Sequence, residues 1–250
     1  IGDYNEQDFL ISATLLTILG KREKNLGTTR INLTIRSEQP GYFYSQYKGN
    51  FNQWNNSLNK TGIISTSFTY QYKFLESGVS LNRVQNFVYL DTLLLPQQSS
   101  KEFAYLQVYA KTNVDLWKFR IISHLVYQTV QGSNILHLPV FMGNLSLNFV
   151  QPLFKGAAIL QPGLNFFYNT KYYADLYHPA LRSFYLQNKV QTGNYLYMDI
   201  FINLKVQRAR FFVSYTHMNA GWTGYHYYST PGYPDPDGAF KFGISWRFHD

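Results

Sequence analysis

Residues 195–207 read YLYMDIFINLKVQ, and the odd and even positions of this stretch differ in polarity. The even positions are all apolar: Leu196, Met198, Ile200, Ile202, Leu204 and Val206. The odd positions include Asp199, Asn203 and Lys205. Successive side chains of a β-strand point to opposite faces of the sheet, so this stretch predicts a strand with one apolar and one polar face.

The same alternation recurs along most of the chain and predicts an all-β fold with about eleven strands. The expected strands cover residues 9–19, 29–36, 63–74, 78–90, 102–112, 116–129, 141–149, 157–168, 195–207, 209–218 and 239–250. Strands of soluble proteins usually have about 5 to 6 residues, whereas most of these have ten or more, which favours a transmembrane β-barrel. A soluble β-sandwich or lipocalin-like barrel is the alternative, because its apolar face would fill a core.

The composition of the 250 residues narrows the class of protein. Aromatic residues make up 18% and charged residues only 14%, whereas a soluble domain carries about 25% charged residues. The chain has no cysteine, which excludes disulfides and thiolate metal sites. No apolar run reaches the roughly 18 residues that a membrane helix requires. The net charge is +8, but no recognition-helix pattern accompanies it, so we expect no nucleic-acid partner.

The links between the expected strands alternate strictly in length. Short links cover residues 20–27, 75–77, 113–115, 152–156 and 207–208, and long links cover 37–59, 91–101, 130–140, 169–194 and 219–238. In an antiparallel meander, alternate links lie at the same end of the sheet. Short periplasmic turns and long extracellular loops are typical of outer-membrane barrels. The last strand would then end on the periplasmic side, and the first would begin outside.

An odd number of strands has a consequence for the whole barrel. Bacterial single-chain barrels have an even number of strands, and an unpaired strand edge cannot face lipid because its polar backbone groups would lack partners. We therefore expect residues 1–250 to be a single β-barrel domain that forms the C-terminal part of a larger barrel. Missing N-terminal strands of the same protein, or a partner chain, would complete the ring.

The last residues, YYSTPGYPDPDGAFKFGISWRFHD (227–250), resemble the putative porin family of Bacteroidota outer membranes, whose members end with a Pro-Gly-Tyr-Pro loop and an alternating Phe/Trp strand. The stretches QPGYFYSQYKGNFNQWNN (39–56) and YYADLYHPALRSFYLQN (172–188) are also similar to that family. The resemblance implies a longer β-barrel in the outer membrane of a Gram-negative bacterium, with a transport role and no catalytic residues.

The strand parity yields candidate pore-lining and lipid-facing residues. Polar candidates are Gln71, Gln128, Asn144, Asn148, Asp199 and Asn203. Basic candidates near the periplasmic end are Lys73, Lys111, Lys118, Arg120, Lys205 and Arg247. The final strand would face outer-membrane lipid with Phe240, Phe242, Ile244, Trp246 and Phe248. A ring of cations at a channel mouth favours anions, although an ordinary solvated rim would have the same composition.

The long loops carry a second set of candidates, which are aromatic: Tyr42, Tyr44, Trp54, Trp222, Tyr225 and Tyr233. Aromatic rings beside amides suit sugar rings, so these residues are candidates for a glycan-contacting surface. The alternative is that they pack the loops against one another.

We therefore expect a channel for passive diffusion of small polar or anionic solutes. The alternative is a plugged barrel that acts as a scaffold, holding a surface lipoprotein or a glycan within a larger assembly. The six histidines show no spacing typical of a metal site, and no Gly-x-Ser-x-Gly motif is present. We expect no enzymatic activity, no metal and no cofactor.

Overall fold

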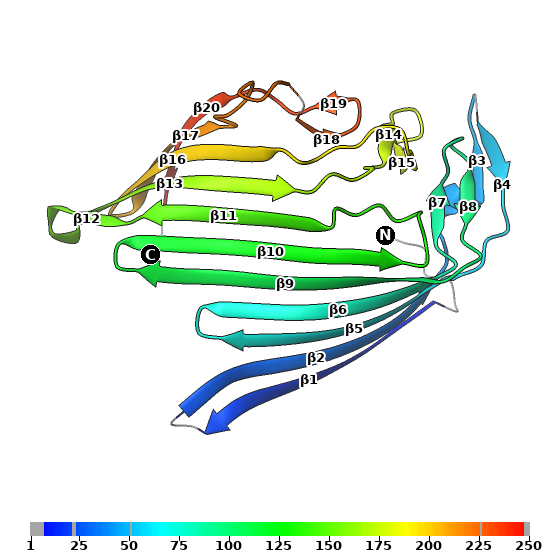
Figure 1. The fold of residues 1–250 in the computed structure, drawn as a ribbon, viewed down its shortest axis with the longest axis horizontal. Helices are drawn as coiled ribbons and strands as arrows, with labels where there is room; N and C mark the ends of the chain where they lie inside the picture. Colours follow the sequence, from blue (N-terminus) through cyan, green and yellow to red (C-terminus); the bar gives the residue numbers. More distant parts are fainter. Residues whose placement is uncertain (1–7, 22–23, 51, 226, 248–250) are drawn as a thin grey trace.

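The structure is a computed structural model that describes residues 8–21, 24–50, 52–225 and 227–247. Its main feature is one large antiparallel sheet in which eleven strands follow one another in chain order (Figure 1). The eleven strands are β1 (Phe9–Lys21), β2 (Lys24–Glu38), β5 (Thr61–Tyr72), β6 (Leu75–Gln85), β9 (Phe103–Leu116), β10 (Phe119–Gln131), β11 (Phe141–Phe149), β13 (Ala158–Asn169), β16 (Leu196–Val206), β17 (Ala209–Thr216) and β20 (Ala239–Trp246). The short β12 (Gln151–Leu153) also pairs with β13. The predicted all-β fold with about eleven antiparallel strands is confirmed.

The remaining elements are short and lie between these strands. Four small hairpins occupy long connections: β3 (Gln46–Lys48) with β4 (Gln53–Asn55), β7 (Val88–Leu90) with β8 (Pro96–Gln98), β14 (Leu176–His178) with β15 (Ser183–Tyr185), and β18 (Tyr228–Thr230) with β19 (Tyr233–Pro234). The helix α1 (Tyr42–Ser45) precedes β3, and the 3₁₀ turn η1 (Phe154–Gly156) follows β12. No described helix is long and apolar enough to cross a membrane.

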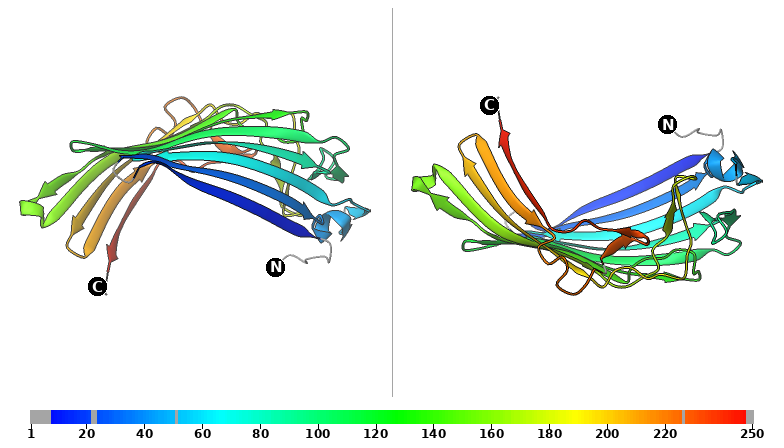
Figure 2. Two further views of the ribbon diagram at one scale, coloured as in Figure 1. Left: turned by 90° about the horizontal axis from the view of Figure 1, so that it is seen from below. Right: turned by 90° about the horizontal axis from the view of Figure 1, so that it is seen from above.

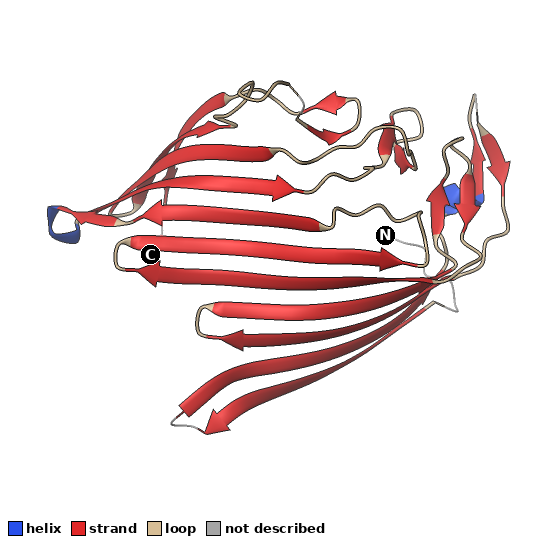
Figure 3. Cartoon of the chain, in the orientation of Figure 1, coloured by secondary structure: helices blue, strands red, loops and turns tan. Residues whose placement is uncertain are grey.

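The sheet is curved and open (Figure 2). Within the described residues, β1 pairs only with β2 and β20 only with β17, so the two edge strands do not meet. The long connections lie at one end of the sheet, which we call the long-loop end, and the short ones lie at the other, the short-turn end (Figure 3). The sheet is therefore a segment of a barrel wall.

Two of the predicted turns were wrong. Residues 75–77 and 113–115 belong to β6 and β9, and the chain instead reverses at residues 73–74 and 117–118. Lys73 and Trp117 begin these reversals with φ of 48° and 57°, a left-handed conformation usually taken by Gly or Asn. The sequence therefore lacks the usual signal at both turns. The predicted strand 78–90 was also too long, because Asn86 takes a φ of 54° after the end of β6.

The strand register separates a polar face from an apolar one. One row of residues in register crosses six strands and is entirely polar: Thr14, Asn32, Ser67, Ser80, Gln107 and Gln128. On the opposite face, a parallel row is entirely apolar or aromatic: Leu15, Ile31, Phe68, Val79, Val108 and Tyr127. On β1 the polar face also carries large apolar residues that are exposed, including Leu16 and Ile18.

The apolar face is exposed. Every member of the apolar row is exposed, and Phe242 on β20 is 76% exposed. A soluble sandwich would bury this face, so that alternative is wrong. Exposed aromatic residues also lie toward both ends of the strands, including Trp117 and Trp246 at the short-turn end and Tyr127 and Phe240 at the other. Such aromatic girdles mark the two interfaces of a membrane barrel.

Candidate functional site

The polar face is the surface on which the predicted pore-lining residues lie. A second row in register contains Thr28, Gln71, Glu76, Lys111, His124 and Asn144. Asp199 is in register with Asn165, and Asn203 with Gln161. Connections at the long-loop end fold over this face, because Gln128 donates to Pro139 O (2.9 Å) and His217 N donates to Asp199 Oδ1 (2.8 Å). The structure thus brings the polar candidates together on one face of the sheet.

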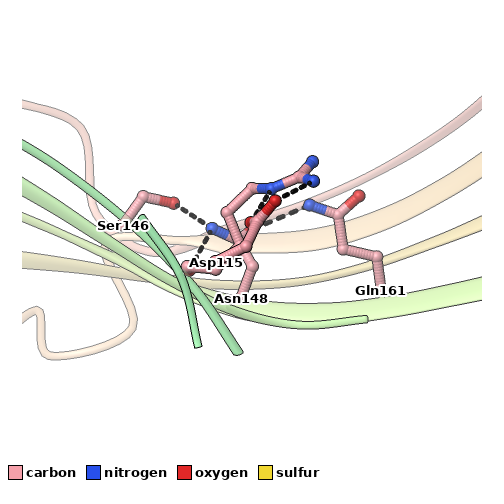
Figure 4. A network of polar contacts seen from close by, with 5 residues as sticks. Asp115, Ser146, Asn148 and Gln161 are labelled. Carbon is pink, nitrogen blue, oxygen red and sulfur yellow. Dashed lines mark hydrogen bonds and ion pairs between the residues drawn. The ribbon is translucent and has the colours of Figure 1, made fainter. Parts of the chain in front are cut away.

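A hydrogen-bonded network centred on Asn148 ties this wall together across four strands (Figure 4). Asn148 is only 3% exposed, and its Nδ2 donates to Arg120 O (3.3 Å) and to Ser146 Oγ (3.0 Å). Its Oδ1 accepts from Gln161 Nε2 (2.9 Å). Arg120 is held in turn by a two-point ion pair with Asp115, at 2.6 and 3.0 Å. Such a network of linked hydrogen bonds favours a single arrangement of these side chains on the wall.

The basic candidates do not form a uniform ring, because carboxylates pair with two of them. Arg120 is bound to Asp115, and Lys111 Nζ lies 3.2 Å from Glu76 Oε1. Sequence reasoning missed both acids because it placed residues 75–77 and 113–115 in turns. With the turns placed correctly, strand parity puts Glu76 and Asp115 on the polar face.

The other basic candidates lie near the short turns. Lys118 Nζ donates to Gln151 Oε1 (2.6 Å) and lies 4.9 Å from the centre of the Trp117 ring. Lys73 lies 5.0 Å from the Tyr72 ring centre.

Three cations lie near one another at the C-terminal side of the sheet. Lys205 and Arg210 face each other in register across β16 and β17, and no ion pair of either is found among the described residues. Like charges directly opposite each other destabilise a sheet. This pair therefore lowers the stability of the fold, so its presence is not explained by folding. Arg247 lies at the same end, where its backbone N–H donates to Arg208 O (3.2 Å). We call Lys205, Arg210 and Arg247 the cationic cluster.

Three long loops pack into a cap at the long-loop end. Trp54, Leu90 and Leu181 come from three different loops and form a buried apolar cluster. Trp54 is 7% exposed, stacks on Tyr47 with ring centres 4.7 Å apart, and donates its indole N–H to Phe43 O (2.7 Å). We call the residues packed around this cluster the loop cap.

The loop aromatic residues therefore separate into two groups. Trp54 is buried and Tyr44 half-buried in the loop cap, so both pack loops together, and burial raises the pKa of the Tyr44 hydroxyl. Tyr42, Trp222, Tyr225 and Tyr233 are instead exposed. Only this second group remains available for contact with a ligand.

The loop that connects β17 to β20 is fixed by His217, which is buried. Its ring Nδ1 donates to Pro236 O (2.8 Å), and its Nε2 lies 2.9 Å from the Tyr195 hydroxyl. A second tie joins the Tyr227 hydroxyl to Asp237, and this hydrogen bond raises the pKa of Tyr227 to about 12. Sequence reasoning did not predict a structural role for His217, although the stretch Asp235–Asp237 follows a Tyr-rich one and offers such partners.

The final strand presents its predicted lipid-facing side chains on the apolar face. Phe240, Phe242, Ile244 and Trp246 are all exposed, and Phe242 is in register with Val213 of β17. Phe248 lies outside the described residues. Arg247 follows β20 and continues the polar parity of that strand.

Comparison with known proteins places this geometry in a family. The family model described as "Putative porin" matches residues 2–250. No curated protein matches the chain. A crystal structure of the ferric enterobactin receptor PfeA in complex with BCV-L6 has a similar fold, with a TM-score of 0.62 at 13% identity over 94% of this chain and 40% of the receptor chain. A mutant of that receptor from Pseudomonas aeruginosa, in complex with enterobactin, gives a TM-score of 0.53 at 11% identity over 84% and 35% of the two chains. The chain thus spans about two fifths of the receptor's length, and the likeness concerns the fold alone.

Proposed function

The chain belongs to the putative porin family, and on that premise we propose that it forms part of an outer-membrane channel through which small polar solutes diffuse passively. The observation that carries this proposal is the pair of opposed faces, one polar and covered by loops, the other apolar and exposed. A polar inner wall is what a water-filled lumen requires. The family resemblance adds a Gram-negative host of the Bacteroidota, and no catalytic role is part of the proposal.

We further propose that the channel prefers anions. Lys111 and Arg120 contribute little to this preference because Glu76 and Asp115 neutralise them. The preference would instead come from the cationic cluster near the short-turn end. Cations in a narrow, low-dielectric mouth raise the local concentration of anions and repel other cations.

The test is conductance of the full-length protein in planar lipid bilayers with a salt gradient. We expect steady currents and a reversal potential on the anion-selective side. The double variant Lys205→Glu, Arg210→Glu should shift that potential toward cations. The matched control is the double variant Arg182→Glu, Lys189→Glu, which makes the same change of charge at two exposed loop residues away from the cluster. A channel that conducts but prefers cations would contradict the anion preference alone, whereas no current at all would contradict the channel.

A second candidate is a plugged barrel that serves as a scaffold for a surface lipoprotein or a glycan. The loop cap supports it, because three loops packed through Trp54, Leu90 and Leu181 form a preformed surface at the mouth. Under this candidate, the full-length protein would carry no steady current, and affinity purification from native membranes would recover a partner. A conducting protein that purifies alone would contradict it.

We also propose that further strands complete the ring in the membrane. The outer edges of β1 and β20 carry backbone N–H and C=O groups that would meet hydrocarbon without partners, which is unfavourable. These strands would come from the same protein or from a partner chain. Native mass spectrometry of the full-length protein separates the two sources, because a partner chain would add its mass to the complex.

A further inference from the structure

The polar face between β13 and β17 carries aromatic side chains, which a purely water-lined wall does not require. They are Phe167, Tyr197, Phe201 and Phe212. Phe167 and Tyr197 are in register across β13 and β16, with ring centres 6.2 Å apart. We call these four residues the inner aromatic patch.

Two rings of the patch lie close to glycines of the neighbouring strands. A Cβ atom on Gly163 would come within 2.4 Å of the Phe201 ring, and one on Gly243 within 2.6 Å of the Phe212 ring. Each ring therefore occupies space that a side chain on the neighbouring strand would fill, and Phe212 is 38% exposed.

Amide groups without partners surround this patch. The side chains of Asn144, Asn165 and Asn203 make no hydrogen bond within the described part of the chain. Asp199 Oδ1 accepts from His217 N, which leaves its second oxygen available. A cavity of about 270 Å³ lies at the Phe167 and Tyr197 end of the patch, and its lining also includes Asn144, Asn165 and Asp199. Phe201, Asn203 and Phe212 continue the same face toward the short-turn end, outside this cavity.

The chemistry of this cavity fits an uncharged ligand that is rich in hydroxyl groups. Each amide offers both donors and an acceptor, which matches a hydroxyl group that also donates and accepts. The ring faces can cover the C–H face of a sugar ring, excluding water from both surfaces. No lysine or arginine lines the cavity, so nothing in it favours an anion.

We propose that the inner aromatic patch and its amides form a binding subsite for neutral sugars on the channel wall. The proposal rests on the proposed function, since it takes the polar face as the lumen. It assigns to this subsite a solute class different from that favoured by the cationic cluster. Anions would be concentrated at the short-turn end, whereas sugars would bind nearer the middle of the wall.

Equilibrium binding to the full-length protein in detergent micelles tests the subsite. Isothermal titration calorimetry would use maltohexaose as the neutral probe and citrate as the anionic one. The variant Phe212→Ala removes one ring of the patch, and Phe211→Ala is its matched control. The two residues are adjacent, are both 38% exposed and lie on opposite faces of β17. We expect Phe212→Ala to weaken maltohexaose binding about tenfold, or about 1.4 kcal/mol. Phe211→Ala should leave it unchanged.

A second variant, Asn165→Leu, removes an amide and keeps every ring, so the proposal stays testable if Phe212→Ala does not fold. It should also weaken maltohexaose binding. Absence of maltohexaose binding to the native protein, or equal losses in Phe212→Ala and Phe211→Ala, would overturn the subsite. If the protein conducts ions but does not bind maltohexaose, the subsite is refuted and the channel is supported. If it binds maltohexaose but does not conduct, the channel is refuted and the subsite is supported.

Discussion

Ile202 and Asn203 allow the cost of a charge to be compared between the two faces of the sheet, because they are adjacent in β16 and point in opposite directions. Ile202 is 48% exposed and lies in register with Pro162 and Val213 on the apolar face. Asn203 lies in register with Gln161 and Phe212 on the polar face. Replacing either residue with arginine places the same charge at nearly the same depth.

The expected cost follows from that depth. The 11 residues of β16 extend about 34 Å at about 3.4 Å per residue, or about 24 Å across a membrane at a tilt of about 45°. Ile202 is one residue from the centre of the strand and therefore lies close to the bilayer midplane. An arginine on the lipid face there costs about 2–4 kcal/mol, a factor of about 30 to 700 in the unfolding equilibrium constant. Asn203→Arg should change stability by less than about 0.5 kcal/mol.

The assay is reversible unfolding of the full-length protein from lipid vesicles in guanidinium chloride, followed by the fluorescence of its tryptophans. We expect the midpoint of Ile202→Arg to fall clearly below that of the native protein, with Asn203→Arg close to native. Equal destabilisation by the two variants, or a larger effect of Asn203→Arg, would refute the assignment of the faces.

Further predictions concern the loops and the polar wall. Trp54→Ala should raise hydrogen exchange in residues 42–56, because truncating a buried tryptophan costs about 3–5 kcal/mol, and unchanged exchange would speak against the loop cap. His217→Ala should free residues 217–238 to proteolysis at the cell surface, and a loop that stays resistant would show that His217 does not hold it. Asp115→Asn should shift the reversal potential toward anions by freeing Arg120, and a null shift would mean that this pair lies away from the ion path. The pKa of the Tyr227 hydroxyl is about 10 in the unfolded loop and about 12 in the folded one, so as pH rises this hydroxyl ionises first in the unfolded loop. The tie to Asp237 therefore stabilises the loop fully below about pH 10, and this effect is lost as pH rises through about 12, which the difference in tyrosinate absorbance between the native protein and Tyr227→Phe can follow.

Strand alternation predicted the sheet because the membrane imposes the same rule on every strand. Lipid requires apolar side chains at every second position, as Ile200, Ile202 and Leu204 show, whatever the neighbouring strands are. The strict alternation of short and long links likewise made the antiparallel order predictable. The confirmed family resemblance depended on the terminal loop and strand, which also carry this alternation.

Other features could not be predicted because they depend on contacts between distant segments. The turn at Trp117 and Lys118 lacks glycine and asparagine, so its position is set by the register of β9 with β10. The pairing of Glu76 with Lys111 depends on the register of β6 with β9. Burial of Trp54 depends on Leu90 and Leu181, and nothing in the sequence near Trp54 indicates those partners.

The central claim is that the sheet separates lipid on one face from a water-filled lumen on the other, and single-cysteine scanning along β16 tests it most directly. The chain has no cysteine of its own, so each introduced thiol reports alone. In full-length protein in vesicles, a membrane-impermeant maleimide should label Asp199→Cys and Asn203→Cys and leave Ile200→Cys and Ile202→Cys unlabelled. Labelling that ignores this alternation, or that favours Ile200→Cys and Ile202→Cys, would contradict the claim.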